Sequence, residues 1–308
     1  MSVGSGAGTF NVVAASGVSP VVVTITQGTL GSSLSDYSGV SKFVVNGSAT
    51  LAAPDALGGG TGTLPRPMEV SLGTLWVTNA TALNGPTTLM GGTSLILNTP
   101  LSGTGMLTRS GGAISLVINN ANALTGTQLT PAFVQAGDSV EIRENNVVGL
   151  ANLNPAAKFS VVINSSFTTQ QGDGMELNGG SLLIAETRWD AGSAGLGDGT
   201  LHVGPLGETI TARAPSSAPP FLTGALLTVP VVAEGPVQFG MGSQDASQRA
   251  PIILSNTGNH FAGVVVNGIT VAAANPGALA GGSVTLAGGL WGWRTRQGMV
   301  CRRFITIL

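Results

Sequence analysis

The sequence has little charge, few aromatic residues and almost no cysteine. Charged residues make up 8% of the 308 positions, against about 25% in an average soluble domain, and aromatic residues make up 5%. A single cysteine, Cys301, excludes an internal disulfide framework and a zinc site built on cysteine ligands. A surface of uncharged Ser, Thr, Asn and Gly suits a long, regular protein better than a compact domain that charge keeps in solution.

Long apolar runs and helical patterns are also missing. No window offers ~18 apolar residues without Gly, Asn or Thr, so no transmembrane helix is expected despite a mean hydropathy of +0.36. Glycine interrupts almost every stretch in which apolar residues would have to recur at helical spacing. Residues 1–6 lack the basic and apolar regions of a signal peptide, so we expect any export signal to be encoded elsewhere.

The net charge gives no reason to expect nucleic acid as a partner. The formal net charge is −2, but four of the ten arginines lie in the last fifteen residues. Without those four positive charges the remaining chain carries −2 − 4 = −6, which is unsuited to a phosphate backbone.

Short apolar runs bounded by glycine and asparagine dominate the sequence. They are rich in valine and isoleucine and flanked by turn residues, which is the signature of β-strands. Examples are residues 21–25, 43–45, 95–97, 114–118, 161–163 and 264–266. An all-β fold is therefore expected, with very little helix.

The runs belong to a degenerate repeat. Its idealised unit is an apolar strand, a polar corner, Ala-Leu-x-Gly, and then Gly-Gly-x-apolar-x-apolar, with copies at 44–59, 73–95, 114–126 and 265–282. Repeats of this length indicate a solenoid, because one unit cannot bury its own apolar face and must stack on its neighbours. The leucine of each Ala-Leu pair is expected inside the coil: Leu57, Leu83, Leu124 and Leu279.

These phrases resemble the repeats of bacterial autotransporter passenger domains. Residues 102–112, Ser-Gly-Thr-Gly-Met-Leu-Thr-Arg-Ser-Gly-Gly, are similar to a Gly-x-Gly-x-Leu-Thr-Lys-x-Gly phrase of that family. The resemblance covers residues 39–125 and 259–290 best. It implies a right-handed, single-stranded parallel β-helix (a β-solenoid) that is exported and displayed on a bacterial cell surface.

Two segments depart from the repeat. A proline-rich stretch near 213–236 is expected to protrude as a loop from a solenoid that spans 1–289. Residues 290–308 change character and are expected to form a non-repetitive C-terminal tail.

Candidate catalytic groups are few and scattered. His202 and His260 lie in different repeats, and a lone histidine is seldom catalytic. Asp173 and Asp198 each stand between two glycines, as turn residues do, although one coil of separation would bring them together. The best acidic cluster adds three more carboxylates: Glu176, Glu186 and Asp190. No catalytic, cofactor-binding or metal-binding residue is predicted.

Aromatic residues point to surfaces for association. Trp76, Trp189, Trp291 and Trp293 are potential platforms for stacking sugars, and Trp76 is expected to face outward from its strand. The apolar runs near the two ends favour head-to-tail contact between subunits. The possible assembly interface comprises Phe10, Val12, Trp291, Trp293, Arg294 and Phe304.

We therefore expect an extracellular structural or adhesive solenoid, either a surface stalk or a subunit of a self-assembling fibre, and not an enzyme. Its expected partners are copies of itself or surface glycans of a host, with no cofactor, no nucleic acid and no membrane span. Two alternatives stay open: a carbohydrate-active β-helix enzyme, either a polysaccharide lyase or a glycosidase, and a phage-type receptor-binding spike. Carboxylates converging in a groove on one face would favour the enzyme.

Overall fold

The chain is an all-β parallel β-solenoid of about nine turns, which confirms the fold class expected from the sequence. The computed structural model describes residues 19–32, 36–58, 64–130, 132–162, 166–168, 174–185, 188–190, 199–213, 224–240, 250–279, 281–287, 290–295 and 298–301. The right-handed winding stays a prediction.

The described residues form strands and three short 3₁₀ turns, with no α-helix among them. None of these segments is a helix long and apolar enough to cross a membrane. The chain divides into two compact units, Met1–Val134 and Gln135–Leu308.

The elements of the first unit are β1 (Val21–Leu30), β2 (Val40–Leu51), β3 (Met68–Val77), β4 (Thr87–Met90), β5 (Ser94–Leu97), β6 (Leu107–Ser110), β7 (Ser115–Ile118) and η1 (Ala123–Thr125).

Those of the second unit are β8 (Ser139–Ile142), η2 (Leu150–Asn152), β9 (Lys158–Val161), β10 (Ser166–Thr168), β11 (Met175–Leu177), β12 (Ser181–Ala185), β13 (Arg188–Asp190), β14 (Leu201–Val203), β15 (Glu208–Arg213), β16 (Ala225–Leu227), β17 (Val231–Phe239), β18 (Ile252–Leu254), β19 (His260–Val266), β20 (Thr270–Ala273), η4 (Pro276–Leu279), β21 (Ser283–Leu286), β22 (Leu290–Thr295) and β23 (Gly298–Cys301).

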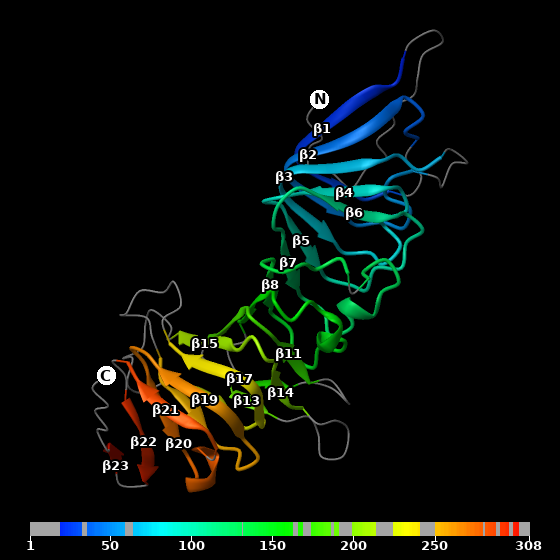
Figure 1. Ribbon diagram of the computed structural model, residues 1–308. Helices are drawn as coiled ribbons and strands as arrows, with labels where there is room; N and C mark the ends of the chain where they lie inside the picture. Colours follow the sequence, from blue (N-terminus) through cyan, green and yellow to red (C-terminus); the bar gives the residue numbers. More distant parts are fainter. Residues whose placement is uncertain are drawn as a thin grey trace. The chain divides into compact units, whose positions relative to one another are not determined.

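In the first unit, β1, β2 and β3 are long parallel strands that pair with one another, and beyond β3 the sheet splits into two separate stacks (Figure 1). The first half of β3 pairs with β4, which pairs with β6, whereas its second half pairs with β5, which pairs with β7. The bend between the halves requires glycine. Gly73 has φ +89°, and a Cβ there would lie 1.8 Å from the carbonyl oxygen of Gly47 on the coil before.

Apolar side chains of successive coils stack inside the first unit. One inward column comprises Ala49, Leu75, Leu95 and Leu116, all of which are buried. Strand alternation places every second residue of β2, β3, β5 and β7 in such a column. Burial of these side chains therefore stabilises both the packing within each coil and the packing of each coil against its neighbours.

The third side of the first unit consists of turns held by side-chain amides. Leu57, Leu83 and Leu124 are buried there, as the repeat predicted. Asn84 is buried beside them: its Oδ1 accepts a hydrogen bond from the Leu57 N–H at 3.1 Å, and its Nδ2 donates to the Gly58 carbonyl. On this side, the hydrogen bonds of Asn84 join successive coils where the other sides use pairing between strands.

The second unit has three parallel stacks. One runs β8-β9-β12-β15-β17-β19-β21 and another runs β11-β14-β17, with β17 long enough to serve both. The third runs β10-β13-β16-β18-β20-β22, and β23 folds back antiparallel to β22. Phe239 and Phe261 pack edge to face inside the unit, with ring centroids 6.1 Å apart.

The prediction that Leu279 is buried was wrong. Leu279 is half-buried, whereas the preceding Ala278 is fully buried and its carbonyl accepts a hydrogen bond from Asn259 Nδ2 at 2.8 Å. Ala123 is likewise fully buried, beside a buried Leu124, so the alanine does not explain the difference. Leu124 lies in the middle of η1, whereas Leu279 is the last residue of η4.

The two segments expected to depart from the repeat contain strands. Within 213–236, residues 214–223 lie outside the described residues, and the remainder carries β16 and most of β17. β17 passes Pro236 at a register shift, where a residue without an N–H is tolerated. Of 290–308, β22 continues the third stack in parallel, and 302–308 lie outside the described residues.

Candidate functional site

The outward side chains of the first unit form columns, one residue per coil, on the two sides of the glycine bend. We call the outer side of the stack β1-β2-β3-β4-β6 the ion-pair face. Its central column comprises Thr24, Val44, Glu69, Thr88 and Thr108, which are partners in register on successive strands. Neighbouring strands lie about 4.8 Å apart, so each column presents a side chain at that interval.

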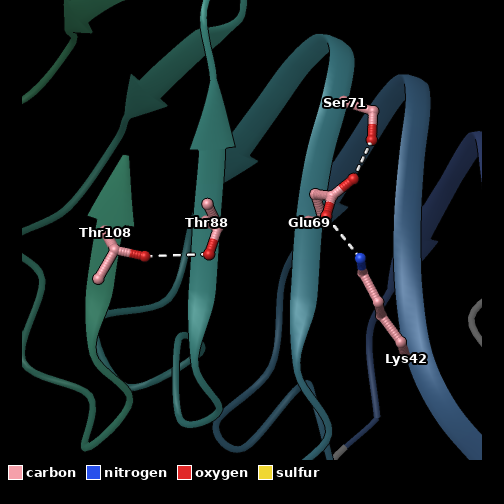
Figure 2. A network of polar contacts seen from close by, with 5 residues as sticks. All are labelled: Lys42, Glu69, Ser71, Thr88 and Thr108. Atoms are coloured by element: carbon pink, nitrogen blue, oxygen red, sulfur yellow. Dashed lines mark hydrogen bonds and ion pairs between the residues drawn. The ribbon is translucent and has the colours of Figure 1, made fainter. Parts of the chain in front are cut away.

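A carboxylate with two donors lies at the centre of the ion-pair face (Figure 2). Lys42 Nζ on β2 donates to Glu69 Oε2 at 2.5 Å, and Ser71 Oγ donates to Glu69 Oε1 at 2.6 Å. The hydrogen bond from Lys42, followed by that from Ser71, holds the pKa of Glu69 below its usual value. The glutamate therefore stays ionised, and its charge is neutralised by the lysine of the coil before.

Two threonines extend the same column. Figure 2 shows Thr88 on β4 next to Glu69, and Thr108 on β6 on the far side of Thr88. The hydroxyl oxygens of the two threonines are 3.0 Å apart. The Thr108 hydroxyl also lies 3.3 Å from the Thr87 carbonyl oxygen, to which it can donate. The hydroxyl groups thus link coil to coil on the outside, as the backbone does within the sheet.

The second outward surface, which we call the tryptophan face, covers the stack formed by the second halves of β1, β2 and β3 with β5 and β7. Its two columns are in register on those five strands: Gln27, Ser48, Thr74, Ser94 and Ser115 form the first, and Thr29, Thr50, Trp76, Ile96 and Val117 form the second. Trp76 is half-buried, and its outward direction agrees with the sequence prediction.

The second unit brings together two candidate residues that the sequence keeps far apart. Glu176 on β11 and His202 on β14 are register partners, and the same outward column continues through Val232 to His260. Glu176 and His260 are exposed, whereas His202 is half-buried. Within the described ranges, no group of three or more His, Cys, Asp and Glu side chains is placed to hold a metal ion.

Glu208 is a buried acid of the second unit, with 5% of its surface exposed. Its carboxylate accepts hydrogen bonds from the Thr209 N–H at 3.0 Å and from the Gly180 N–H at 3.2 Å. Burial is the main cause that raises the pKa of Glu208, to about 7, against the two hydrogen bonds that lower it.

Comparison of the chain with protein-family models, with curated proteins and with solved structures finds no match.

Much of the interface and acidic cluster predicted from the sequence falls outside what the structure describes. Residues wholly outside the described ranges are Phe10, Val12, Asp173, Glu186, Asp198 and Phe304. The structure describes the backbone alone for Trp189 and Asp190 in β13 and for Trp291, Trp293 and Arg294 in β22. Glu176, the remaining acid of the cluster, is exposed on β11.

Sequence reasoning missed the ion pair of Lys42 with Glu69 and the burial of Glu208. The lysine and the glutamate are 27 positions apart in the chain, slightly more than the single coil that leads from Phe43 to its register partner Met68. One signal was available. Once the repeat is aligned, Lys42 stands two residues before the position that faces Glu69 on the neighbouring strand, so both side chains lie on the same side of the sheet.

Proposed function

We propose that the chain is an extracellular structural protein: a surface stalk of stacked coils with adhesive outward faces. The observation that carries the proposal is the in-register stacking of coils within each unit. Within each unit, the described coils are joined by parallel backbone hydrogen bonds, by buried apolar columns and, in the first unit, by outward pairs such as Lys42 with Glu69.

Such stacking suits a load-bearing role. Each coil contacts chiefly its two neighbours, so stability is the sum of similar interfaces, and tension is shared among many parallel hydrogen bonds. An isolated exposed ion pair contributes at most about 1 kcal/mol, so the apolar columns and the backbone carry most of the resistance.

The bacterial surface location rests on the resemblance of the repeats to autotransporter passenger domains. The same resemblance supports a right-handed winding. Outward faces of neutral hydroxyl side chains, in which Glu69 is balanced by Lys42, fit a protein that contacts surfaces without a strong field of either sign. Self-association through residues near the two ends is part of the proposal, with surface glycans as the other partner.

Single-molecule pulling on the full chain, held by handles fused to its ends, tests the stalk. One coil is the stretch of chain between register partners, such as Val140 with Phe159 or Ile210 with Phe239. Fully extended at about 3.4 Å per residue, a released coil of this kind lengthens the chain by roughly 65–100 Å. We expect a series of steps of that size as coils detach in turn. Release of the whole chain in one event would overturn the proposal.

One observation favours a second function, a carbohydrate-active enzyme. Glu176 and His202 are partners on neighbouring strands of an outward face, where an acid and a base can reach the same substrate. Incubation with a panel of polysaccharides, followed by an assay for new reducing ends or unsaturated products, tests it. Turnover that is lost in Glu176→Gln and in His202→Ala would establish the enzyme; absence of turnover in the wild type would remove it.

A further inference from the structure

The tryptophan face combines an aromatic ring with a row of hydroxyl groups. Trp76 lies between Thr50 of the coil before and Ile96 of the coil after. Ile96 and Val117, the next members of this column, are 6% and 4% exposed, whereas Trp76 is half-buried. The indole is therefore the large apolar group of the column that remains partly accessible.

The hydroxyl column runs parallel to the tryptophan column, two residues earlier on each strand. Ser48, Thr74, Ser94 and Ser115 are partners in register and are all half-buried. A hydroxyl donates one hydrogen bond and accepts two, so this row offers both kinds of partner at intervals of about 4.8 Å.

The two columns contain no ionisable side chain among their ten members. A nucleic acid or an anionic polymer would require cations here, and a lipid surface would require a broad apolar patch that the hydroxyl column interrupts. A sugar ring has one face of C–H groups and an edge of hydroxyls. The C–H face fits the negative face of an indole, and the edge fits a row of serine and threonine hydroxyls.

We propose that the tryptophan face binds an uncharged polysaccharide, with one sugar ring stacked on Trp76 and the chain of sugars hydrogen-bonded to the hydroxyl column. This inference rests on the proposed adhesive function and specifies its ligand. Successive coils repeat the hydroxyl, so a polymer that runs across the strands meets the same chemistry at each coil. Binding therefore grows with the length of the sugar chain.

Native gel electrophoresis of the full chain, with an uncharged polysaccharide such as mannan or a β-glucan cast into the gel, tests the proposal. We expect retardation of the wild type by at least one neutral polymer and none by anionic alginate. Because an aromatic contact contributes ~0.5–1.5 kcal/mol beyond its buried area, Trp76→Ala should weaken binding by up to about tenfold.

Two further variants keep the test decisive. Thr74→Val preserves volume while removing one hydroxyl, so it reports on the column even where Trp76→Ala disturbs folding. Thr285→Ala removes an exposed hydroxyl from β21 of the second unit and should leave retardation unchanged. Equal retardation of the wild type, Trp76→Ala and Thr74→Val overturns the inference, as does retardation by alginate alone or by no neutral polymer. The pulling experiment does not depend on sugar binding, so failure of the polysaccharide proposal and failure of the stalk proposal can be told apart.

Discussion

The buried carboxyl of Glu208 makes the stability of the second unit depend on pH. An acid whose pKa is higher in the folded than in the unfolded chain binds its proton more tightly when folded. The contribution of Glu208 to the free energy of unfolding is therefore largest below pH 4.5, the ordinary value for this group, and is lost as the pH rises through about 7. A difference of about 2.5 pKa units at 1.36 kcal/mol each corresponds to a loss of about 3 kcal/mol.

Glu208→Gln should abolish most of this slope. The amide keeps the shape of the side chain and one of its acceptors, so the cost of the lost acceptor, ~1 kcal/mol, applies at every pH. Urea unfolding followed by circular dichroism at pH 4.5, 6 and 8 gives the slope for the wild type and the variant. Glu176→Gln, which alters an exposed carboxylate of the same unit, is the matched control. Equal slopes in the wild type and Glu208→Gln would show that the buried carboxyl is not the source of the pH dependence.

Three further predictions concern packing and assembly. Leu83→Ala, at a fully buried turn, should cost about 2–5 kcal/mol in urea unfolding, and Leu279→Ala, at a half-buried one, clearly less; equal costs would contradict the turn packing. Gly73→Ala should lower the free energy of unfolding more than Gly92→Ala, because only the former places a Cβ against backbone atoms. Gly92→Ala introduces only the strain of a left-handed backbone conformation, ~1–2 kcal/mol. The reverse order would contradict the role of Gly73 in the bend. Deleting residues 291–308 should reduce particle size in light scattering, and a wild type that stays monomeric at high concentration removes the assembly proposal.

The sequence was sufficient to predict strands, turns and stacking, because these depend on local patterns. The apolar runs at 43–45 and 95–97 lie in strands, as predicted, and the leucines of the Ala-Leu pairs at 57, 83 and 124 are buried, as predicted. The prediction for Leu279 failed because its Ala-Leu pair ends the η4 turn, whereas the pair at 123–124 begins η1 and is buried in both members. The dipeptide alone does not define its place within the turn, on which the burial of the leucine depends.

Residues that lie side by side on successive coils could not be predicted from the sequence, because the coils differ in length. The coil from Met175 to its partner Leu201 is longer than the coil from Leu75 to its partner Leu95. An error of one residue moves a side chain to the other side of the sheet. The pairing of Glu176 with His202 and the ion pair on the first unit therefore emerge only once the register of every strand is known.

Paired pyrene labels test most directly whether outward residues of successive coils stand in register. In a Cys301→Ser background, cysteines placed at Ser94 and Ser115 carry pyrene on partnered positions of β5 and β7. We expect strong excimer fluorescence from this pair, and little from a pair at Thr88 and Ser115, which lie on different stacks. No excimer from the first pair, or equal excimer from both, would contradict it.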